Sequence, residues 1–411
     1  MSSTPATRLL HRGLGNSFRV HQDAGDSAAW SYVAFAGRRP DFADALAAQD
    51  CRYTLLTNGA EADRFQVIDR TPEAHPATVH DGWMAERTSP DGAELADDTT
   101  PSITTSPARL VAELVARRSA GASPVAIVPC DNLSDNGSVV AGVVRSVAEQ
   151  VDARLMDWLE AHTSYVTTVV DRITQAVPDD DRSAVARATG WDDQPPAMAE
   201  PSSEWIIQGD FLDGRPAWET IGTMLNPYID PFERRKLTLL NGVHSVLAYA
   251  GSSRGHANMS DAVSDPVCRR WIEQWWGEAE RHLPLPADEP TAYHTTLLAR
   301  FENRRVRHLL SQIAADGSAK TAVRTVPVLL AQRDEERLPE GATRALAAWL
   351  WHLRERTEHV SDVHAAKVLA IAAGPLDEAA RGVLESLDAA LADDAAVVAG
   401  VADHARSRGT R

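Results

Sequence analysis

The spacing of apolar residues changes about halfway along the chain. Up to residue 175, short apolar runs alternate with polar segments that suit helices, an order typical of a sheet covered by helices. The predicted strands are RLL, WSYVAF, RYTLLT, FQVID, ATVHDGWM, VAIV and TSYVTTVVDRITQ. Later in the chain, apolar residues recur at helical spacing. The helices predicted there lie around residues 232–250, 266–283, 296–315, 341–356, 362–372 and 376–407.

The segment Pro178–Ser203 is rich in Asp and Pro and contains QPPAMAEPSS, which is typical of a linker. A boundary at residue 200 separates the two patterns. We therefore predict an α/β domain over residues 1–200 and a mainly α-helical domain over residues 201–411.

A glycine turn follows the first predicted strand. RLLHR leads into Gly13-Leu14-Gly15, and a polar run that suits a helix begins at Asn16. Strand, glycine turn and helix together form the entry of a dinucleotide site in a Rossmann-type fold. The motif is incomplete, because its third glycine would fall at Phe18. Gly13, Gly15 and Asn16 are the predicted cofactor contacts.

The second predicted strand is followed by basic and acidic residues, and either type can determine which nicotinamide cofactor binds. WSYVAF is followed by Arg38, Arg39 and Asp41. An acid at this place holds the ribose hydroxyls of NAD, whereas an arginine accepts the 2′-phosphate of NADP. All three residues are candidate cofactor contacts, and both NAD and NADP stay open.

Polar residues also follow the strand Val125–Val128. Asp131 and Asn132 come directly after it, and Asn136-Gly137 opens a predicted helix. Open α/β sheets bind ligands beyond the carboxyl ends of their strands, so Asp131 and Asn132 are further candidate cofactor contacts. The alternative is a loop whose Asx residues only cap the helix.

The segment RRKLTLLNGVHSVLAYAG predicts an apolar helix with an unusual polar set. It carries Lys236, one of three lysines in the chain, together with Asn241 and His244. At about 100° per residue these three groups share one arc of an α-helix. Gly242 costs about 1 kcal/mol of helix propensity, which close approach of a ligand or backbone would offset. The alternative is a buried helix with an internally satisfied polar cluster.

Lys, Asn and His suit the interconversion of an alcohol and a ketone. The hydride of this reaction passes to or from a nicotinamide. Lys236 can move the hydroxyl proton if burial lowers its pKa from about 10.4 towards 7–8. Asn241 can donate a hydrogen bond to the developing alkoxide, and His244 can orient a neighbouring hydroxyl.

Other dehydrogenase and hydrolase signatures are missing from the sequence. Phe232, Asp316 and Val363 stand four residues before the three lysines, so there is no Tyr-x3-Lys pair. The three cysteines are far apart and no HExxH occurs, so we expect no metal. GxSxG and P-loop motifs are likewise absent.

Composition limits the class of protein further. The 411 residues are 44% hydrophobic and 24% charged, which is typical of a soluble globular protein with two domains. A net charge of −17 argues against nucleic acid as a partner. No apolar run is long enough for a membrane span and no secretory leader is visible, so we expect a cytoplasmic protein. The oligomeric state is open.

Several motifs, in order, resemble the polyol-specific long-chain dehydrogenase/reductase family, which includes mannitol 2-dehydrogenase and fructuronate reductase. The matching stretches are GLGNSFRVHQ, DALAAQDCRYTLL, PCDNLSDNG, VVDRIT, EWIIQGDFLDGRPAWE, KLTLLNGVHSVLAYAG and RFENRRVRHLLSQIAADGSAK. The pattern Lys-x4-Asn-x2-His is the most specific of them. The resemblance implies a Rossmann domain, a helical domain, a cleft between them and a nicotinamide cofactor without a metal.

The resemblance also assigns roles. Lys236 would be the general acid/base, Asn241 would stabilise the alkoxide, and His244 and Lys320 would contact the substrate. The family's second oxyanion asparagine falls at Thr167, and its substrate arginine falls at Gln312. Thr167 and Gln312 are therefore candidate substrate contacts with altered chemistry.

The sequence departs from the family pattern at two further places, and four functions stay open. The family's acidic pair falls at Gln208-Gly209, and its TEKGY stretch is not recognisable near Trp83–Arg87. Loss of the arginine at Gln312 favours a neutral polyol. The alternatives are a hexuronate reductase using Arg254 or Arg324, a phosphorylated-polyol dehydrogenase, and a cofactor-binding sensor without turnover.

Overall fold

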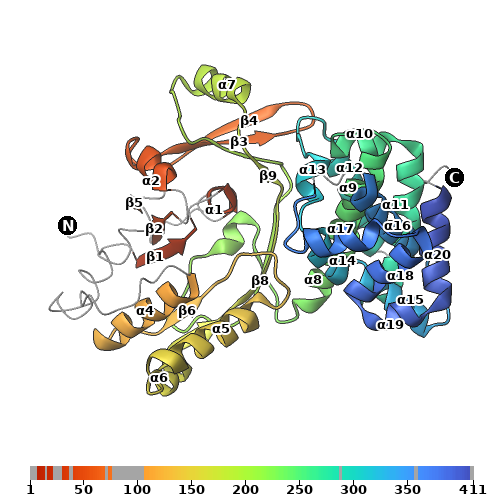
Figure 1. Ribbon diagram of the computed structural model, residues 1–411. Coiled ribbons are helices and arrows are strands. Elements are labelled where there is room, and N and C mark those ends of the chain that lie inside the picture. Colours follow the sequence, from red (N-terminus) through yellow and green to blue (C-terminus); the bar gives the residue numbers. More distant parts are fainter. Residues whose placement is uncertain are drawn as a thin grey trace. The chain divides into compact units, whose positions relative to one another are not determined.

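The computed structural model describes residues 7–13, 16–21, 30–36, 40–69, 73–75, 106–286, 289–355 and 360–407. The chain forms two compact units, residues 1–230 and 231–411 (Figure 1). The sequence placed the boundary at residue 200. The later division arises because β11 (Glu204–Gln208) pairs antiparallel with β8 (Thr167–Asp171) inside the first unit.

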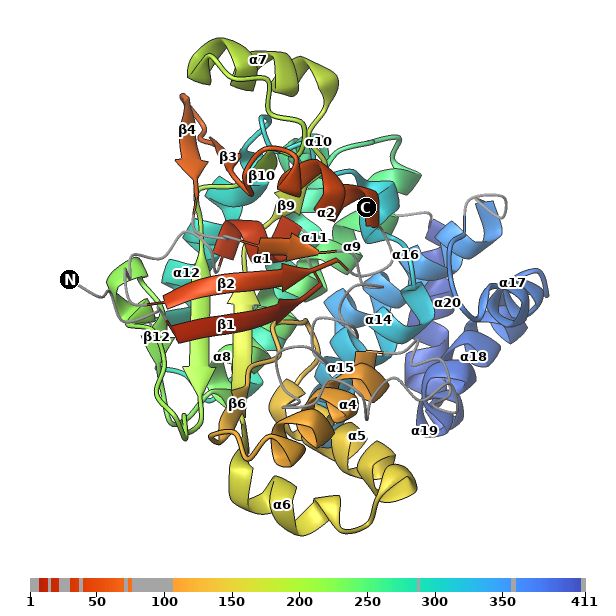
Figure 2. The ribbon, with the colours of Figure 1, turned by 90° about the vertical axis from the view of Figure 1, so that its left-hand side faces the viewer.

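The first unit begins with the predicted Rossmann-type strands. β1 (Thr7–Arg12) runs parallel to β2 (Trp30–Phe35), as Figure 2 shows, and β2 runs parallel to β5 (Glu73–His75). Gly13 ends β1 with φ +101°, a conformation that favours glycine, and its N–H donates to the carbonyl of Phe35 at 3.0 Å. The glycine turn predicted after the first strand is therefore confirmed at Gly13.

The other strands of the first unit form three further sheets. Their orders are β4-β3-β10-β9, β12-β11-β8 and β6-β7. The remaining strands are β3 (Tyr53–Asn58), β4 (Asp63–Ile68), β6 (Val125–Ile127), β7 (Thr163–Tyr165), β9 (Thr174–Gln175), β10 (Ala197–Ala199) and β12 (Met224–Leu225). The helices are α1 (Asn16–His21), α2 (Pro40–Ala47), α4 (Ser106–Ser119), α5 (Asn136–Val151), α6 (Leu155–His162), α7 (Asp179–Thr189) and the short 3-10 turn η1 (Trp218–Ile221).

Two predictions for this unit were wrong. TSYVTTVVDRITQ is not one strand, because β7, β8 and β9 pair in three different sheets. The predicted linker Pro178–Ser203 is not a linker either. It contains α7 and β10, whose residues Ala197–Ala199 are buried and pair parallel with β3. Its Asp and Pro residues lie in and around an amphipathic helix that the compositional criterion could not distinguish from a linker.

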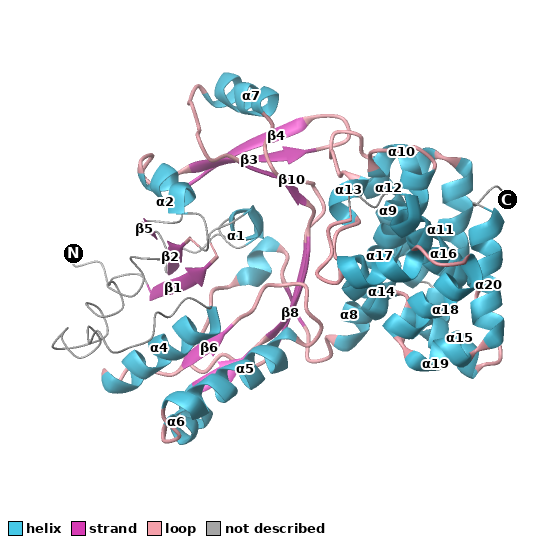
Figure 3. Ribbon diagram, viewed as in Figure 1, coloured by secondary structure: helices cyan, strands magenta, loops and turns pink. Residues whose placement is uncertain are grey.

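The second unit is built from helices alone among its described residues (Figure 3). They surround one continuous apolar core that includes the buried Trp275 and Trp349. The helices are α8 (Asp230–Arg235), η2 (Lys236–Asn241), α9 (Gly242–Ser253), α10 (Met259–Ser264), α11 (Pro266–Ala279), η3 (Glu280–His282), α12 (Glu289–Glu302), α13 (Leu310–Ile313), α14 (Gly317–Arg324), α15 (Val326–Asp334), α16 (Glu340–Glu355), α17 (Ala365–Ala372), α18 (Leu376–Leu387), α19 (Ala389–Asp393) and α20 (Ala395–Ser407). The α/β unit and the helical unit match the predicted fold class.

Asx side chains divide two of the predicted helices. The predicted helix 296–315 stops at Glu302, where the carbonyl oxygen of the Asn303 side chain accepts the backbone N–H of Arg305. The predicted helix 376–407 is interrupted at Asp388 and Asp394, whose carboxylates accept backbone N–H groups two residues on. Helices α14 and α15 were not predicted. No described helix in either unit is long and apolar enough to span a bilayer.

Candidate active site

The segment that carries Lys236, Asn241 and His244 is not a continuous α-helix. Residues Lys236–Asn241 form a π-helix between α8 and α9. A π-helix closes its hydrogen bonds over five residues and so takes more residues per turn than an α-helix. Asn241 is therefore rotated closer to Lys236 than the predicted α-helix would allow. Such bulges are frequent at functional sites.

Two tryptophans of α11 bind the backbone of the π-helix. Trp275 donates its indole N–H to the carbonyl of Thr238 at 2.9 Å, and Trp276 donates to the carbonyl of Leu239 at 2.9 Å. These are the carbonyl groups at the place where the helix changes its hydrogen-bond pattern. The Trp-Trp pair, which the sequence analysis left without a role, thus stabilises the turn that carries Lys236 and Asn241.

Gly242 permits this close packing. A Cβ at Gly242 would lie 2.5 Å from Trp275 Cζ2, which is closer than any ordinary contact. The φ of Gly242, −59°, is helical and open to any residue. Glycine is therefore needed at this position for lack of space and not for its backbone conformation. The sequence-based explanation, in which a ligand or a second backbone approaches Gly242 closely, is wrong about the approaching group. The approaching group is an indole ring.

Lys236 and His244 are buried to the same degree. Each is 8% exposed. Burial lowers the pKa of His244 well below its ordinary value of 6.5, and His308, Arg324, Arg300 and Lys236 lower it further by electrostatic repulsion. His244 is therefore a neutral imidazole at pH 7. Within the described part of the chain nothing hydrogen-bonds to its Nε2 atom.

His308 faces His244 from the loop before α13. The two imidazole rings meet edge to face with centroids 5.1 Å apart, and Phe301 contacts His244 at 5.3 Å. Burial, followed by the charge of Arg300, lowers the pKa of His308 to about 4. The sequence analysis did not single out His308. Its contact with His244 depends on the conformation of the loop before α13, which helical periodicity cannot predict.

Arg324 holds the end of the π-helix from α14. Its Nη1 group donates to the carbonyl of Asn241 at 3.2 Å and to Oγ of Ser245 at 3.0 Å. Burial lowers the pKa of Arg324 to about 10, so its guanidinium stays charged at pH 7. Arg324 thus supports the backbone of a predicted catalytic residue.

Lys320 lies one turn before Arg324 on the same helix. Its ammonium group donates to the carbonyl of Ile313 at 3.1 Å. Burial, and then the charge of Arg324, lowers the pKa of Lys320, whereas Asp316 and Asp362 act in the opposite direction. Gln312, on α13, is exposed, and its side chain makes no hydrogen bond to any residue that the structure describes. Lys320, but not Gln312, therefore has a side-chain hydrogen bond to a described residue and lies within the electrostatic influence of Arg324, which binds the π-helix.

The predicted cofactor contacts lie in the first unit. Gly13 is exposed, and a Cβ built on it would meet nothing within 4 Å, so the turn leaves room for a dinucleotide. Asn16 begins α1 after this turn, and Asp41 is exposed in the first turn of α2, which follows β2. Gly15, Arg38 and Arg39 lie outside the described residues, as do Trp83–Arg87 and the predicted strand ATVHDGWM.

The loop after β6 uses one Asx residue as a structural support. Asn136 is buried and exchanges two hydrogen bonds with Thr168, because its Nδ2 donates to the carbonyl at 3.1 Å and its Oδ1 accepts the N–H at 3.0 Å. Asp131 is exposed and accepts the backbone N–H of Leu133 at 2.9 Å, as expected for a local turn. Asn132 is also exposed. Asp131 thus forms a turn before α5 and does not cap that helix, whose N-cap Asp135 makes no side-chain capping bond. The contact of Asp131 with a cofactor stays a prediction.

Thr167 and Gln208 stand opposite each other on β8 and β11. Thr167 donates through Oγ1 to Asp135 at 3.4 Å, and the same atom would lie 2.6 Å from a Cβ on Gly137. Gln208 donates to the carbonyl of Pro227 at 2.8 Å and helps to line an open pocket of about 870 Å³ in the first unit. Both residues have structural partners.

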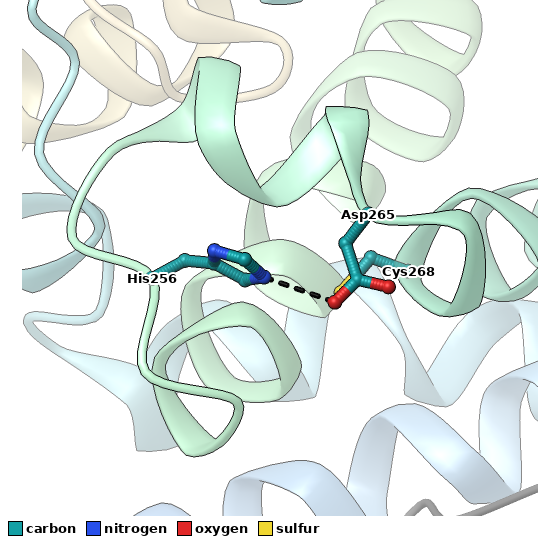
Figure 4. Close-up of side chains that lie close together, drawn as sticks. All are labelled: His256, Asp265 and Cys268. Carbon is teal, nitrogen blue, oxygen red and sulfur yellow. Dashed lines mark hydrogen bonds and ion pairs between the residues drawn. The ribbon is translucent and has the colours of Figure 1, made fainter.

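One cluster outside this region resembles a metal site. Ligand atoms of His256, Asp265 and Cys268 lie within 4.8 Å of one another (Figure 4). However, Oδ2 of Asp265 already accepts hydrogen bonds from Arg254 at 2.7 Å and His256 at 3.0 Å. Burial, followed by the charge of Asp265, raises the pKa of Cys268 to about 12, which disfavours the thiolate that a metal needs.

The cluster is better explained as a structural connection. Burial raises the pKa of Asp265, but the hydrogen bonds from Arg254 and His256 outweigh burial and hold the pKa below its ordinary range. The loop that carries His256 also pairs with the loop before α13. Met259 N–H donates to the carbonyl of His308 at 2.9 Å. Asp265 therefore anchors the segment against which the His308 loop is held.

Both units match known protein-family models. The model described as the mannitol dehydrogenase Rossmann domain matches residues 7–220, and the one described as the mannitol dehydrogenase C-terminal domain matches residues 228–405. The fold and the site thus define a two-domain oxidoreductase. The chain belongs to the mannitol dehydrogenase family.

Individual relatives agree with this assignment. The chain is 29% identical to mannitol 2-dehydrogenase of Cereibacter sphaeroides, over 83% of this chain and 80% of that protein. It is 29% identical to D-mannonate oxidoreductase of Escherichia coli K12, over 79% and 75%. The structure of Pseudomonas fluorescens mannitol 2-dehydrogenase in ternary complex with NAD and D-mannitol aligns with a TM-score of 0.84 and 26% identity, covering 98% of this chain and 92% of that one.

Proposed function

We propose that this chain is an NAD-dependent dehydrogenase that interconverts a secondary alcohol of a polyol or sugar acid and the corresponding ketone. Lys236 is its general acid/base. The observation that carries the proposal is the buried π-helix, which holds Lys236 and Asn241 on a segment of unusual geometry directly before His244. Relatives that carry the names mannitol 2-dehydrogenase and D-mannonate oxidoreductase support the range of substrates.

The first unit supports NAD as the cofactor. NAD supplies the hydride acceptor when it is bound. Gly13 leaves its turn open, and Asp41 follows β2, where an acid can hold the ribose hydroxyls. The solved relative whose complex contains NAD agrees with this choice. We propose Gly15, Asn16, Arg38, Arg39, Asp131 and Asn132 as the remaining contacts, and NADP as the alternative cofactor.

Each polar residue around the π-helix has a role that its surroundings support. Lys236 takes the proton of the reacting hydroxyl during oxidation and returns it during reduction. The side-chain amide of Asn241 donates to the developing alkoxide, and the bond from Arg324 to the Asn241 carbonyl fixes the backbone from which that amide projects. Neither role requires a metal.

His244 orients the substrate as a neutral imidazole. Burial keeps it uncharged at pH 7, so one ring nitrogen donates and the other accepts. A hydroxyl group both donates and accepts, and it can satisfy either nitrogen. Lys320 provides a further donor to the substrate. Thr167 and Gln312 are weaker candidates, because Thr167 already donates to Asp135 and Gln312 is exposed without a hydrogen bond to a described residue.

A substrate panel tests the proposal. Purified protein is mixed with NAD or NADP and with hexitols, pentitols or hexonates, or with NADH or NADPH and with ketoses or hexuronates, and absorbance of the reduced cofactor is followed. We expect turnover with at least one substrate and a higher kcat/KM with NAD(H). A protein that binds NADH but turns over none of these substrates would instead be a sensor.

A further inference from the structure

We propose that Arg235 is a positioning residue for Lys236, because Glu289 and Tyr293 of α12 hold its side chain and thereby fix the end of α8 from which Lys236 projects. This role rests on the proposed function, which assigns the proton of the reacting hydroxyl to Lys236. Arg235 acts on the reaction only through Lys236, and no step of the proposed function uses it otherwise.

Arg235 is a buried cation directly before a buried amine. Arg235 is 6% exposed and Lys236 is 8% exposed. Nη1 of Arg235 donates to Oε1 of Glu289 at 2.7 Å, which forms an ion pair between α8 and α12. Replacing a buried ion pair by apolar groups of similar size is often neutral or stabilising, because the loss of hydration offsets the attraction of the charges. Stability alone is therefore a weak reason for this pair, and a fixed geometry is a better one.

Two aromatic rings restrict the guanidinium of Arg235 further. Its central carbon lies 4.3 Å from the ring centroid of Tyr293 and 5.2 Å from that of Phe232. Phe232 lies three residues before Arg235 on α8, and Glu289 lies four residues before Tyr293 on α12, so each pair shares one face of its helix. A planar guanidinium that meets both a carboxylate and an aromatic ring keeps few orientations. These contacts thus join one face of α8 to one face of α12.

The position of Arg235 in the chain connects this contact to Lys236. Arg235 is the last residue of α8, and its φ of −56° and ψ of −53° are helical, so the chain continues into the π-helix without a break. Successive side chains of an α-helix point about 100° apart. Any rotation of α8 about its axis would therefore turn Lys236 as well, and the anchorage of Arg235 to α12 opposes that rotation.

α12 also supports the segment beyond Lys236. His294 of α12 stacks on Trp276 with ring centroids 4.0 Å apart and planes 6° apart, and Trp276 donates to the carbonyl of Leu239 in the π-helix. Phe301, near the end of α12, contacts His244 with centroids 5.3 Å apart. One helix thus supports the segment before, within and after the π-helix, and Arg235 provides the contact nearest Lys236.

The first measurement compares kcat and KM for the best substrate with NADH binding. Arg235→Met should lower kcat by about 10- to 100-fold, the range expected when a reacting group is misplaced by about 1 Å, while KM and NADH binding change by about threefold at most. Arg235→Lys should regain part of kcat, since it can pair with Glu289 again. The double variant with Glu289→Gln should lose no more than Arg235→Met alone, because both changes remove the same contact.

Arg269→Met is the matched control. Arg269 of α11 pairs with Glu302 at the far end of α12, so this variant also breaks an ion pair made by α12, away from Lys236. It should keep kcat within about threefold of wild type. If Arg235→Met does not fold, Glu289→Gln and Arg235→Lys test the same contact.

The second measurement does not require turnover. The chain has three lysines, so labelling by acetic anhydride can be followed separately at Lys236 and at the exposed Lys367 by mass spectrometry of peptides. In the wild type Lys236 should react more slowly than Lys367. Arg235→Met should raise the ratio of Lys236 to Lys367 labelling by about threefold or more, because a side chain released from its packing reacts faster. Arg269→Met should leave this ratio unchanged.

The outcomes separate this role from the proposed function. Unchanged kcat and labelling in Arg235→Met, or equal losses in Arg235→Met and Arg269→Met, would overturn the positioning role and leave the dehydrogenase assignment intact. Absence of turnover by wild type that binds NADH would overturn the dehydrogenase assignment, and with it the role of Arg235 in the reaction. The labelling ratio would then still show whether Arg235 holds Lys236 in place.

Discussion

Gly242 lies against the indole of Trp275 so closely that a Cβ on the glycine would be 2.5 Å from Cζ2 of the ring. This contact lets α11 reach the π-helix and donate two indole hydrogen bonds to it. The contact thus links the core of the helical unit to the geometry of the proposed active site.

Gly242→Ala should therefore destabilise the protein by about 1–3 kcal/mol, the usual cost of overpacking a core. The gain in helix propensity, about 1 kcal/mol, is too small to offset the clash. Gly277→Ala is the control, because Gly277 lies in α11 with nothing within 4 Å of the added Cβ. It should be neutral or stabilising. Urea unfolding of both variants measures the difference, and equal effects would contradict the steric explanation.

Trp276→Phe removes the hydrogen bond to the Leu239 carbonyl. We expect a loss of about 1 kcal/mol of stability beyond the lost ring volume, together with a lower kcat, because the π-turn before Asn241 loses a support. Trp271→Phe is the matched control, since its buried indole N–H has no hydrogen-bond partner among the described residues. If both variants lose the same activity, the indole hydrogen bond has no special role.

Asp265→Asn tests the connection beside the His308 loop. Asparagine keeps the N-cap of α11 but loses the charge that pairs with Arg254 and His256. The folded protein depresses the pKa of Asp265, so its stabilisation is present above the unfolded value of about 3.9 and is lost as pH falls through the folded pKa. The variant should be about 1.5–3 kcal/mol less stable at pH 7, and the difference should shrink below about pH 4.

The exposed Asp403 is the control for this prediction. Asp403→Asn breaks a surface pair with Arg406, so it should change stability by less than about 1 kcal/mol. Chemical denaturation at pH 7 and pH 3.5 distinguishes the two positions. A pH-independent loss at Asp265 would indicate altered packing, not a lost charge.

His308 should also make the protein less stable as pH decreases, as Asp265 does. Its folded pKa of about 4 lies below the unfolded value of about 6.5, so the unfolded chain binds more protons between these values and stability falls as pH decreases through this window. His308→Asn should reduce that slope. Urea midpoints between pH 4 and pH 7 measure it, and an unchanged slope would show that folding does not lower the pKa of His308.

The sequence predicted what depends on residue type and local spacing. The glycine turn at Gly13 could be identified, and the Lys236, Asn241 and His244 set could be proposed, because each needs a particular residue at a particular offset. The family resemblance rested on the same local motifs. The π-helix could not be predicted, since its hydrogen-bond pattern is fixed by indoles that approach from α11, 37 residues away in sequence for Trp275 and Thr238.

Contacts between distant segments were missed for the same reason. His308 meets His244 through a loop held by backbone pairing, and Cys268, Asp265 and His256 converge although the three cysteines are far apart in the sequence. Composition misled at Pro178–Ser203, where Asp-rich sequence forms α7 and the buried apolar residues Ala197–Ala199 form β10. Such errors arise wherever pairing partners, and not local preference, decide the structure.

Lys236→Ala tests the central claim most directly, because Lys236 alone is assigned the proton of the reacting hydroxyl. Turnover of the best substrate is measured together with NADH binding by fluorescence, and Lys367→Ala, which removes an exposed lysine, is the control. We predict that Lys236→Ala lowers kcat by about 10²–10⁴ while NADH binding is retained and Lys367→Ala behaves as wild type. Turnover of the Lys236 variant within a fewfold of wild type would contradict the assignment of Lys236 as the acid/base.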